Sequence, residues 1–379
     1  MERELRAERI RHDVIRLCHS GIDSTALCTA VAALLRQVIP FEAWCAPVAD
    51  PATLLVTAVA GENLPRDKTQ RFFEIEYEVP DFNKFAELGS GARRSGILSK
   101  ATEGAFASSP RWEEVFGPEG FKDELRVAFV NDSVCWGFIG LHRQEPTEFT
   151  AEDAAYLERL GGHLAEGLRL ALLVGDENLE EATDGPGMLI VDDSLQPEMI
   201  TPAAERWLRE IGATPGQEQM GGALPASIYP VLSRLRALEA GNAPADVMPR
   251  SRLRTGSGRW LVIHASRLSG KETAGKTAVI IEEARPSEMA PLIAQAYGLS
   301  AKETELTRLV LRGLSTADVA AELHLSPNTV QDYLKSIFDK VGVRSRRELV
   351  ASIWSQQYWP RIAAGTPVSQ DGWFAQAHR

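Results

Sequence analysis

The sequence predicts a multidomain α+β protein that ends in a small all-α domain. Three observations support this fold class. The chain has 379 residues, enough for two or three domains. Strand-like apolar runs alternate with amphipathic helices up to about residue 285, after which only helical periodicity is present. A polar stretch near residue 176 divides the α+β part in two.

Charge is distributed unevenly along the chain. The net charge of −11 argues against nucleic acid as a partner of the whole surface. Residues 299–357, however, contain eight basic and seven acidic residues, so the acidic excess lies before them. This asymmetry is typical of an acidic body joined to a small DNA-binding domain.

Composition also restricts the compartment. We find no apolar run of the ~18 residues that a membrane span requires, so no membrane partner is expected. The charged N-terminus MERELRAERIRHD does not resemble a secretory signal. Four cysteines without metal-ligand spacing favour a reducing cytoplasm and predict no metal site. The sequence does not identify a cofactor.

The first predicted domain covers residues 1–175. Residues 2–37 have helical periodicity, and EAWCAPVA and TLLVTAVAG are strand-like runs separated by Asp50-Pro51. Strands over 124–130 and 135–143 are joined by a short polar turn, which indicates a hairpin. Thr150 and Asp153 form a capping-box pattern that opens a closing helix.

The second predicted domain covers residues 176–285. Its apolar patterns give the order strand, strand, helix, helix, strand, strand, strand, which predicts an α+β domain. A connector helix is expected over 286–298, and the tail at 358–379 shows no periodicity.

Four helix start signals are predicted within residues 299–357. Three are capping-box patterns, in which a serine is followed three residues later by an acid; the fourth is a serine before proline. They are Ser300 with Glu303, Ser315 with Asp318, Ser345 with Glu348, and Ser326 before Pro327. Gly313 is expected to end the first helix.

The third of these helices has two distinct faces. Its apolar stripe consists of Val330, Tyr333, Leu334, Ile337 and Val341, and its opposite face of Asn328, Gln331, Asp332, Lys335 and Asp339. A helix of ~13 residues is ~20 Å long and fits the major groove of B-DNA.

The run GLSAKETELTRLVLRGLSTADVAAELHLSPNTVQDYLKSIFDKVGVRSRRELVASI resembles the LuxR-type (GerE-type) helix-turn-helix almost throughout. The resemblance implies a tetrahelical DNA-binding domain whose third helix enters the major groove. It places Gln331, Asp332 and Lys335 toward the bases. The residues expected at the DNA backbone are Ser315, Thr316, Ser326, Asn328, Thr329, Lys340, Arg344 and Arg346. The fourth helix is expected to contribute a dimer contact around Arg347, Val350 and Ile353.

Two positions depart from the family pattern. Gln331 stands where many members carry a basic residue, which weakens phosphate attraction but retains base readout. His324 stands where the turn usually has glycine. Histidine is among the residues enriched at positive φ, so the turn is expected to survive.

The two preceding domains resemble known sensor folds. The N-terminal domain resembles a GAF domain, an α/β sandwich, with the closing pattern that runs from Phe149 to Leu160. The second domain resembles an α+β PAS domain, with TPAAERWL after two strands. Both folds surround a pocket that commonly binds a small molecule, and both also serve as ligand-free dimerisation scaffolds. These two alternatives stay open.

Several residues are candidates to line a pocket. Cys45 and Cys135 are candidate redox sensors, but small buried hydrophobes are the expected role. His142 and His264 are candidate ligand contacts, although a surface or hydrogen-bonded histidine is expected at such strand positions. Core packing is expected for the candidate cavity residues Trp44, Trp136 and Trp260.

These observations predict a sequence-specific DNA-binding transcriptional regulator controlled by a signal sensed in the N-terminal domains. Double-stranded DNA, a second copy of the chain, a small-molecule ligand and RNA polymerase are the candidate partners. A homodimer should place two recognition helices one turn apart on a pseudo-palindrome. No nucleophile–base pair, metal cluster or phosphate loop is evident, so we expect no enzyme; the alternative is a GAF-type catalyst carrying a DNA-binding domain. Target genes, signal and direction of regulation are not determined by the sequence.

Overall fold

The computed structural model describes residues 2–144, 148–174, 185–213, 223–243, 247–270, 273 and 275–355. The chain divides into two compact units. The first contains both α+β segments, residues 1–174 and 184–283, and the second is built mainly from residues 284–379. The predicted loose tail at 358–379 lies outside the described residues.

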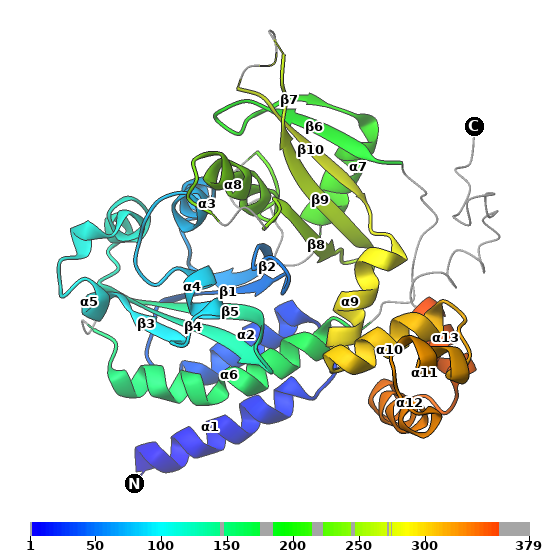
Figure 1. The fold of residues 1–379 in the computed structure, drawn as a ribbon. Coiled ribbons are helices and arrows are strands. Elements are labelled where there is room, and N and C mark those ends of the chain that lie inside the picture. The colour runs from blue at the N-terminus through cyan, green and yellow to red at the C-terminus, as the bar shows by residue number, and fades with distance from the viewer. Residues whose placement is uncertain are drawn as a thin grey trace. The chain divides into compact units, whose positions relative to one another are not determined.

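The first segment is built on a five-stranded antiparallel sheet with strand order β2-β1-β5-β4-β3 (Figure 1). Its strands are β1 Ala43–Ala49, β2 Val56–Glu62, β3 Ser95–Ile97, β4 Asp123–Asn131 and β5 Val134–Arg143. The predicted hairpin is confirmed: β4 and β5 pair across a turn in which Asp132 and Ser133 take positive φ values of 47° and 65°.

Helices cover both faces of this sheet. On one face α6 (Ala151–Ala171) packs against β4 and β5, and α1 and α2 pack beside it. The capping box that opens α6 is confirmed, with the Thr150 hydroxyl accepting from the Asp153 N–H. On the other face α4 (Phe85–Ser90) contacts β4 and β5. The remaining short elements are α3 Thr69–Tyr77, α5 Leu98–Ala101, η1 Arg66–Lys68, η2 Phe106–Ser108, η3 Trp112–Phe116 and η4 Gly117–Glu119.

The helical region predicted over residues 2–37 is not a single element. The structure has α1 (Glu2–Cys18) and α2 (Ser24–Leu35) instead. Gly21 lies between them with a φ of 69°, a left-handed conformation that ends a helix. The Asp23 carboxylate then caps α2 by accepting from the N–H groups of Thr25 and Ala26, both at 2.9 Å.

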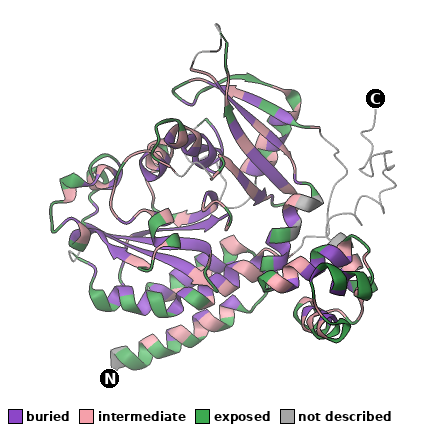
Figure 2. Ribbon diagram, viewed as in Figure 1, coloured by how far each residue is buried: buried purple, intermediate pink, exposed green. Residues whose placement is uncertain are grey.

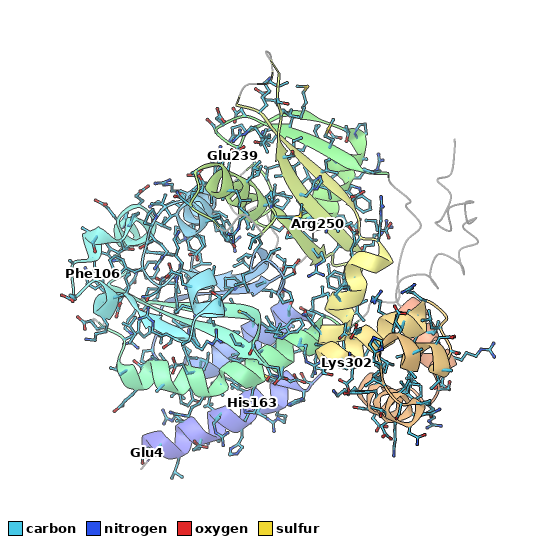
Figure 3. All side chains as sticks on the ribbon, viewed as in Figure 1. Glu4, Phe106, His163, Glu239, Arg250 and Lys302 are labelled. Atoms are coloured by element: carbon cyan, nitrogen blue, oxygen red, sulfur yellow. The ribbon has the colours of Figure 1, made fainter. Side chains whose placement is uncertain are left out.

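The second segment has the predicted order of elements. Its antiparallel sheet has strand order β7-β6-β10-β9-β8. The strands are β6 Gly187–Val191, β7 Pro197–Ile200, β8 Arg250–Arg254, β9 Trp260–Arg267 and β10 Thr277–Glu283, and the helices are α7 Pro202–Gly212 and α8 Ile228–Glu239. Purple stretches in Figure 2 show the buried strand residues of both sheets. Glu239, at the end of α8 (Figure 3), pairs with Arg267 of β9 at 2.7 Å.

The two sheets share a core and a polar contact. Helix α3 packs against α8, and buried residues of both segments belong to one hydrophobic cluster. Asp50, at the end of β1, accepts three hydrogen bonds from Arg252 of β8: one from its backbone N–H and two from its guanidinium, the shortest at 2.6 Å. Both side chains are largely buried. This pair therefore joins the two sheets within the first unit.

The regular elements described in the second unit are all helices, as predicted. It consists of α9 Pro286–Ala296, α10 Ala301–Leu311, α11 Thr316–Glu322, α12 Pro327–Val341 and α13 Arg346–Ser355. The capping boxes of α10 and α11 are confirmed, and Gly313 follows α10 with a φ of 86°. Before α13, the Ser345 hydroxyl accepts from the Glu348 N–H at 3.1 Å. The core is formed by Leu306, Leu309, Val310, Val319, Val330, Leu334, Ile337 and Leu349.

Candidate functional site

A tight turn fixes α12 to α11. His324 has a φ of 53°, so it takes the left-handed conformation that the sequence predicted for this position. The Leu325 N–H donates back to the Ala320 carbonyl at 2.9 Å. Ser326 then caps α12 by accepting from the Thr329 N–H at 3.1 Å, and Pro327 occupies the first helical position. The sequence thus sets where α12 begins and how the chain enters it.

The predicted division of α12 into two faces is confirmed. Val330, Leu334 and Ile337 are buried, and Tyr333 and Val341 pack beside them. Asn328, Gln331, Asp332 and Lys335 are exposed. Because successive residues turn by about 100° around a helix, these four side chains lie within one narrow arc.

Three exposed side chains on this arc have no partner among the residues that the structure describes. Gln331, Asp332 and Lys335 form no hydrogen bond or ion pair with any residue that the structure describes. Gln can pair bidentately with adenine, Asp can accept from cytosine N4, and Lys can donate to guanine O6 or N7. The face is therefore chemically suited to the base edges of a groove.

Some of the residues predicted to contact the DNA backbone also form hydrogen bonds within the domain. Ser315 and Ser326 are N-caps, and the Ser315 hydroxyl also bonds to Asp318 at 2.6 Å. The hydroxyls of Ser326 and Thr329 lie 2.8 Å apart. Thr316 is half-buried and Asn328 is exposed. These small polar groups lie at the starts of α11 and α12, where helix N-termini favour phosphate.

The predicted cationic contacts fall into two groups. The Lys340 ammonium bonds to Glu303 at 2.6 Å, and the Arg346 guanidinium donates to the carbonyl oxygens of Leu314 and Val310. Arg344 is exposed, and its side chain has no partner among the described residues. Of these three cations, Arg344 is thus the one not already bonded inside the domain.

Glu303 forms more hydrogen bonds within the domain than the sequence predicted. It was predicted only as a capping residue, yet its buried carboxylate accepts from the Ser300 N–H at 2.6 Å, the Ser336 hydroxyl at 2.7 Å and Lys340. Burial alone would raise its pKa, but these hydrogen bonds outweigh it and hold the pKa at about 2. The start of α10 is therefore bonded to the second half of α12.

The predicted dimer contact involves α13. Arg347 is exposed and Val350 is half-buried. The side chain of Ile353 lies outside the described residues. The assignment of these residues to a dimer contact stays a prediction.

A small cavity lies within the first segment, on the face of the sheet opposite α6. Its volume is about 50 Å³. It is lined by Cys45, Pro47 and Val59 of the sheet, Thr69, Phe72 and Phe73 of α3, and Leu64, Pro65, Val115 and Phe116. The buried side chains form the floor, and Leu64, Pro65 and Thr69 form a half-exposed rim. The lining is almost entirely apolar, which is typical of small-molecule sites.

A buried ionic network lies on the same face of the sheet. Arg111 pairs with Asp81 at 2.9 Å and with Glu124 at 2.7 Å, and Arg126 pairs with Glu124 at 2.8 Å and with Glu76 at 2.7 Å. We did not predict this network from the sequence. The available signal was the alternation of Glu124 and Arg126 along an otherwise apolar strand, which directs two charges to one face.

The expectation for His142 is wrong. It is neither exposed nor hydrogen-bonded: the side chain is fully buried, and neither ring nitrogen has a partner among the described residues. Its ring stacks on Phe116, with centroids 4.0 Å apart. Sequence position alone did not show that η3 and the following loop cover this end of β5.

Most of the other candidate pocket residues meet their expectation, and Trp260 does not pack in the core. Cys45 and Cys135 are buried, and burial raises the pKa of each thiol to about 12, so neither is a reactive thiolate at neutral pH. Trp44 and Trp136 are buried core residues, and Trp260 is half-buried. His264 is partly exposed on β9.

The four C-terminal helices define a class of domain, and comparison with known proteins supports it. Residues 297–353 match the family described as bacterial regulatory proteins, luxR family. This segment is therefore a helix-turn-helix domain of that family, similar to those of transcriptional regulators. The match covers the second unit from the end of α9 into α13.

The similar proteins match this chain over short segments. The transcriptional regulatory protein YvfU of Bacillus subtilis is 38% identical over 61 residues, which are 16% of this chain and 30% of YvfU. The monoamine regulon transcriptional regulator of Klebsiella aerogenes is 41% identical over 56 residues, 15% of this chain and 25% of that protein. For an HTH-type regulator of Mycobacterium bovis the identity is 43% over 58 residues, only 7% of that protein. The chain thus matches less than a third of these relatives' lengths.

Solved structures resemble the chain only weakly. Escherichia coli SdiA is 13% identical and covers 92% of this chain and 97% of its own, with a TM-score of 0.31. The VqsR LBD domain from Pseudomonas aeruginosa is 16% identical and covers 44% of this chain and 98% of its own, with a TM-score of 0.32. Scores this low do not establish a shared fold.

Among the described residues, no helix is both long and apolar enough to cross a bilayer.

Proposed function

We propose that the protein is a transcriptional regulator that binds double-stranded DNA sequence-specifically through α12. The observation that carries this proposal is the exposed, unpartnered face of Gln331, Asp332 and Lys335 on a helix fixed by a capped turn. Such a face can enter the major groove, where each base pair presents a distinct pattern of donors and acceptors.

Affinity for the DNA backbone is expected to come from several groups around this face. Arg344 and Asn328 are exposed, and Ser315, Thr316, Ser326 and Thr329 lie at helix starts that attract phosphate. Lys340 and Arg346 would contribute while keeping their internal bonds. Each phosphate contact should add to the salt dependence of binding.

We further propose that the protein acts as a homodimer. Two α12 helices one helical turn apart would read a pseudo-palindromic site. Arg347, Val350 and Ile353 of α13 are the expected dimer contact. RNA polymerase is a further proposed partner.

The first unit is proposed to act as the sensor, with a GAF-like first segment and a PAS-like second segment. Two features support this role: the apolar cavity, and the position of α3 between the cavity and the second sheet. Phe72 and Phe73 of α3 line the cavity, whereas Glu74 lies 3.9 Å from Arg236 of α8. A ligand that displaced α3 would therefore disturb its contact with α8. Regulation requires that the ligand bind two arrangements of the protein with different affinity.

DNA binding is tested by fluorescence anisotropy of the full chain with genomic fragments at several salt concentrations. We expect sequence preference and an affinity that falls with salt. The double variant Gln331→Ala with Lys335→Ala should lose sequence preference. The control variant Lys302→Ala, which removes a half-exposed cation from α10, should retain it. Full sequence preference in the double variant would show that the assigned face is wrong. A wild-type protein without preference or salt dependence would overturn the function itself.

A ligand-free dimerisation scaffold is the alternative role for the first unit. Native mass spectrometry of the purified chain compares the two roles. A retained small-molecule adduct would support the sensor, and the adduct mass would give its identity.

A further inference from the structure

Two buried side chains near the cavity, His142 and Arg126, have nitrogen atoms without a hydrogen-bond partner among the described residues. Both ring nitrogens of His142 and the Nη2 atom of Arg126 are unpaired among the described residues. Each side chain is at most 1% exposed. An unpaired buried polar group costs ~1–3 kcal/mol, so each such group calls for an explanation.

Gly140 connects these groups to the cavity. In the register of the sheet it lies between Cys45 of β1 and Arg126 of β4. A Cβ atom at Gly140 would lie 3.0 Å from the Cys45 sulfur and 3.7 Å from His142 Nε2. Cys45 also lines the cavity. The glycine thus leaves a narrow space between the cavity floor and the unpaired imidazole nitrogen.

Two aromatic side chains that line the cavity also contact His142 and Arg126. Phe116 stacks on His142, and the Arg126 guanidinium lies 5.7 Å from the centroid of Phe72. Phe72 and Phe116 both line the cavity. A molecule in the cavity would therefore contact two rings that pack directly against these polar side chains.

The charge of the surrounding network favours an uncharged ligand. Arg111 and Arg126 are balanced by three carboxylates, those of Glu76, Asp81 and Glu124. Even with the half-buried Lys84 nearby, no excess positive charge remains to compensate a buried anion.

His142 is also suited to an uncharged partner. Burial lowers its pKa to about 4, so the imidazole is neutral at neutral pH. A neutral imidazole offers one donor and one acceptor.

We propose that this cavity binds a compact, uncharged molecule with an apolar body and one carbonyl-type head, placed over Gly140 and hydrogen-bonded to His142 or Arg126. This inference rests on the sensory role proposed for the first unit. The cavity volume of about 50 Å³ is a third of the ~150 Å³ known to hold benzene. The apolar body therefore extends toward the half-exposed rim at Leu64 and Pro65.

Three probes of nearly equal size and shape test the ligand class: isopropylbenzene, acetophenone and benzoate. Binding to the full chain is measured by calorimetric titration. Acetophenone should bind about tenfold more tightly than isopropylbenzene, since it adds one hydrogen bond to a buried, unpaired donor. Benzoate should show no binding, because its charge would be buried without compensation.

Variants on neighbouring strands test the position of the head group. Gly140→Ala fills the space beside His142 Nε2, so the preference for acetophenone over isopropylbenzene should disappear. Cys45→Val narrows the same space from β1 and serves if Gly140→Ala does not fold, as judged by circular dichroism. Ala46→Val is the matched control, because Ala46 lies on β1 but faces α6, and its preference should be unchanged.

The outcomes separate this inference from the proposed function. Benzoate bound as tightly as acetophenone, no binding of any probe, or an unchanged preference in a folded Gly140→Ala would overturn the inference. DNA binding is measured on the same preparations by anisotropy. If the wild type shows DNA sequence preference but does not bind acetophenone, only the inference about the ligand is overturned. If the wild type shows no DNA sequence preference, the proposed function is overturned.

Discussion

Replacing Glu303 by glutamine should destabilise the DNA-binding domain without changing its shape. The substitution removes one carboxylate oxygen and the negative charge that three groups share: the Ser300 N–H, the Ser336 hydroxyl and the Lys340 ammonium. Since these donors come from the start of α10 and the second half of α12, the loss should loosen the contact between the two helices.

The magnitude follows from the geometry. A hydrogen bond to a charged group contributes ~1.5–3 kcal/mol when both partners are shielded from water. The Lys340 side chain is 38% exposed and can recover hydration, so the lower part of this range applies. We expect a loss of about 2 kcal/mol in local stability, which corresponds to a ~30-fold change in an opening equilibrium.

The effect should depend on pH in a defined direction. The pKa of Glu303 falls from its ordinary value of 4.5 to about 2 in the folded domain. A depressed pKa means that the carboxylate stabilises the fold above about pH 4.5 and that this contribution disappears as the pH falls toward 2. The wild type and Glu303→Gln should therefore converge in stability at low pH.

Hydrogen exchange followed by mass spectrometry measures this in the full chain. Peptides from α10 and α12 of Glu303→Gln should exchange ~30-fold faster than those of the wild type at pH 6. Glu305→Gln is the matched control: it lies on the same helix, and its ion pair with Lys302 is exposed, with an expected effect of ~0–0.5 kcal/mol. Equal exchange in the two variants would refute the anchoring role of Glu303.

Three further predictions concern the turn, the joint between the sheets and the recognition face. His324→Gly should change the stability of the second unit by less than ~1 kcal/mol. Glycine removes the steric cost of the left-handed conformation, and this gain offsets the larger conformational entropy that glycine loses on folding. Hydrogen exchange in α11 and α12 measures the change, and a larger loss would mean that the histidine side chain contributes a contact. Arg252→Ala should destabilise the first unit by ~3 kcal/mol in urea unfolding, since it leaves the buried Asp50 carboxylate without its guanidinium partner. Additive effects of Arg252→Ala and Asp50→Ala would contradict the pairing. Asp332→Ala should relax sequence preference more than it weakens binding, because it removes a base-selective acceptor and a charge that repels phosphate. Fluorescence anisotropy with operators that differ by a single base measures both effects. Unchanged discrimination between these operators would exclude Asp332 from base readout.

The second unit was predictable because its determinants are local. A serine and an acid three residues apart determine where a helix begins, as Ser300 and Ser315 do, and the 3.6-residue period determines which face of α12 is buried. The left-handed conformation at His324 was also predictable, because this residue stands where the turn usually has glycine. What could not be read locally was that Glu303 reaches Lys340, because residues 37 positions apart in the chain meet only when α10 packs against α12.

In the first unit, the sequence determined the hairpin and, in the second segment, the order of strands and helices, because both follow from alternating and helical periods along the chain. It did not determine the surroundings of His142, the ionic network of Arg111 and Arg126, or the joint between Asp50 and Arg252. These depend on which strands become neighbours and on which loops cover them, and such contacts join residues far apart in the chain. Tertiary structure therefore decided which polar groups are paired and which are left unpaired beside a cavity.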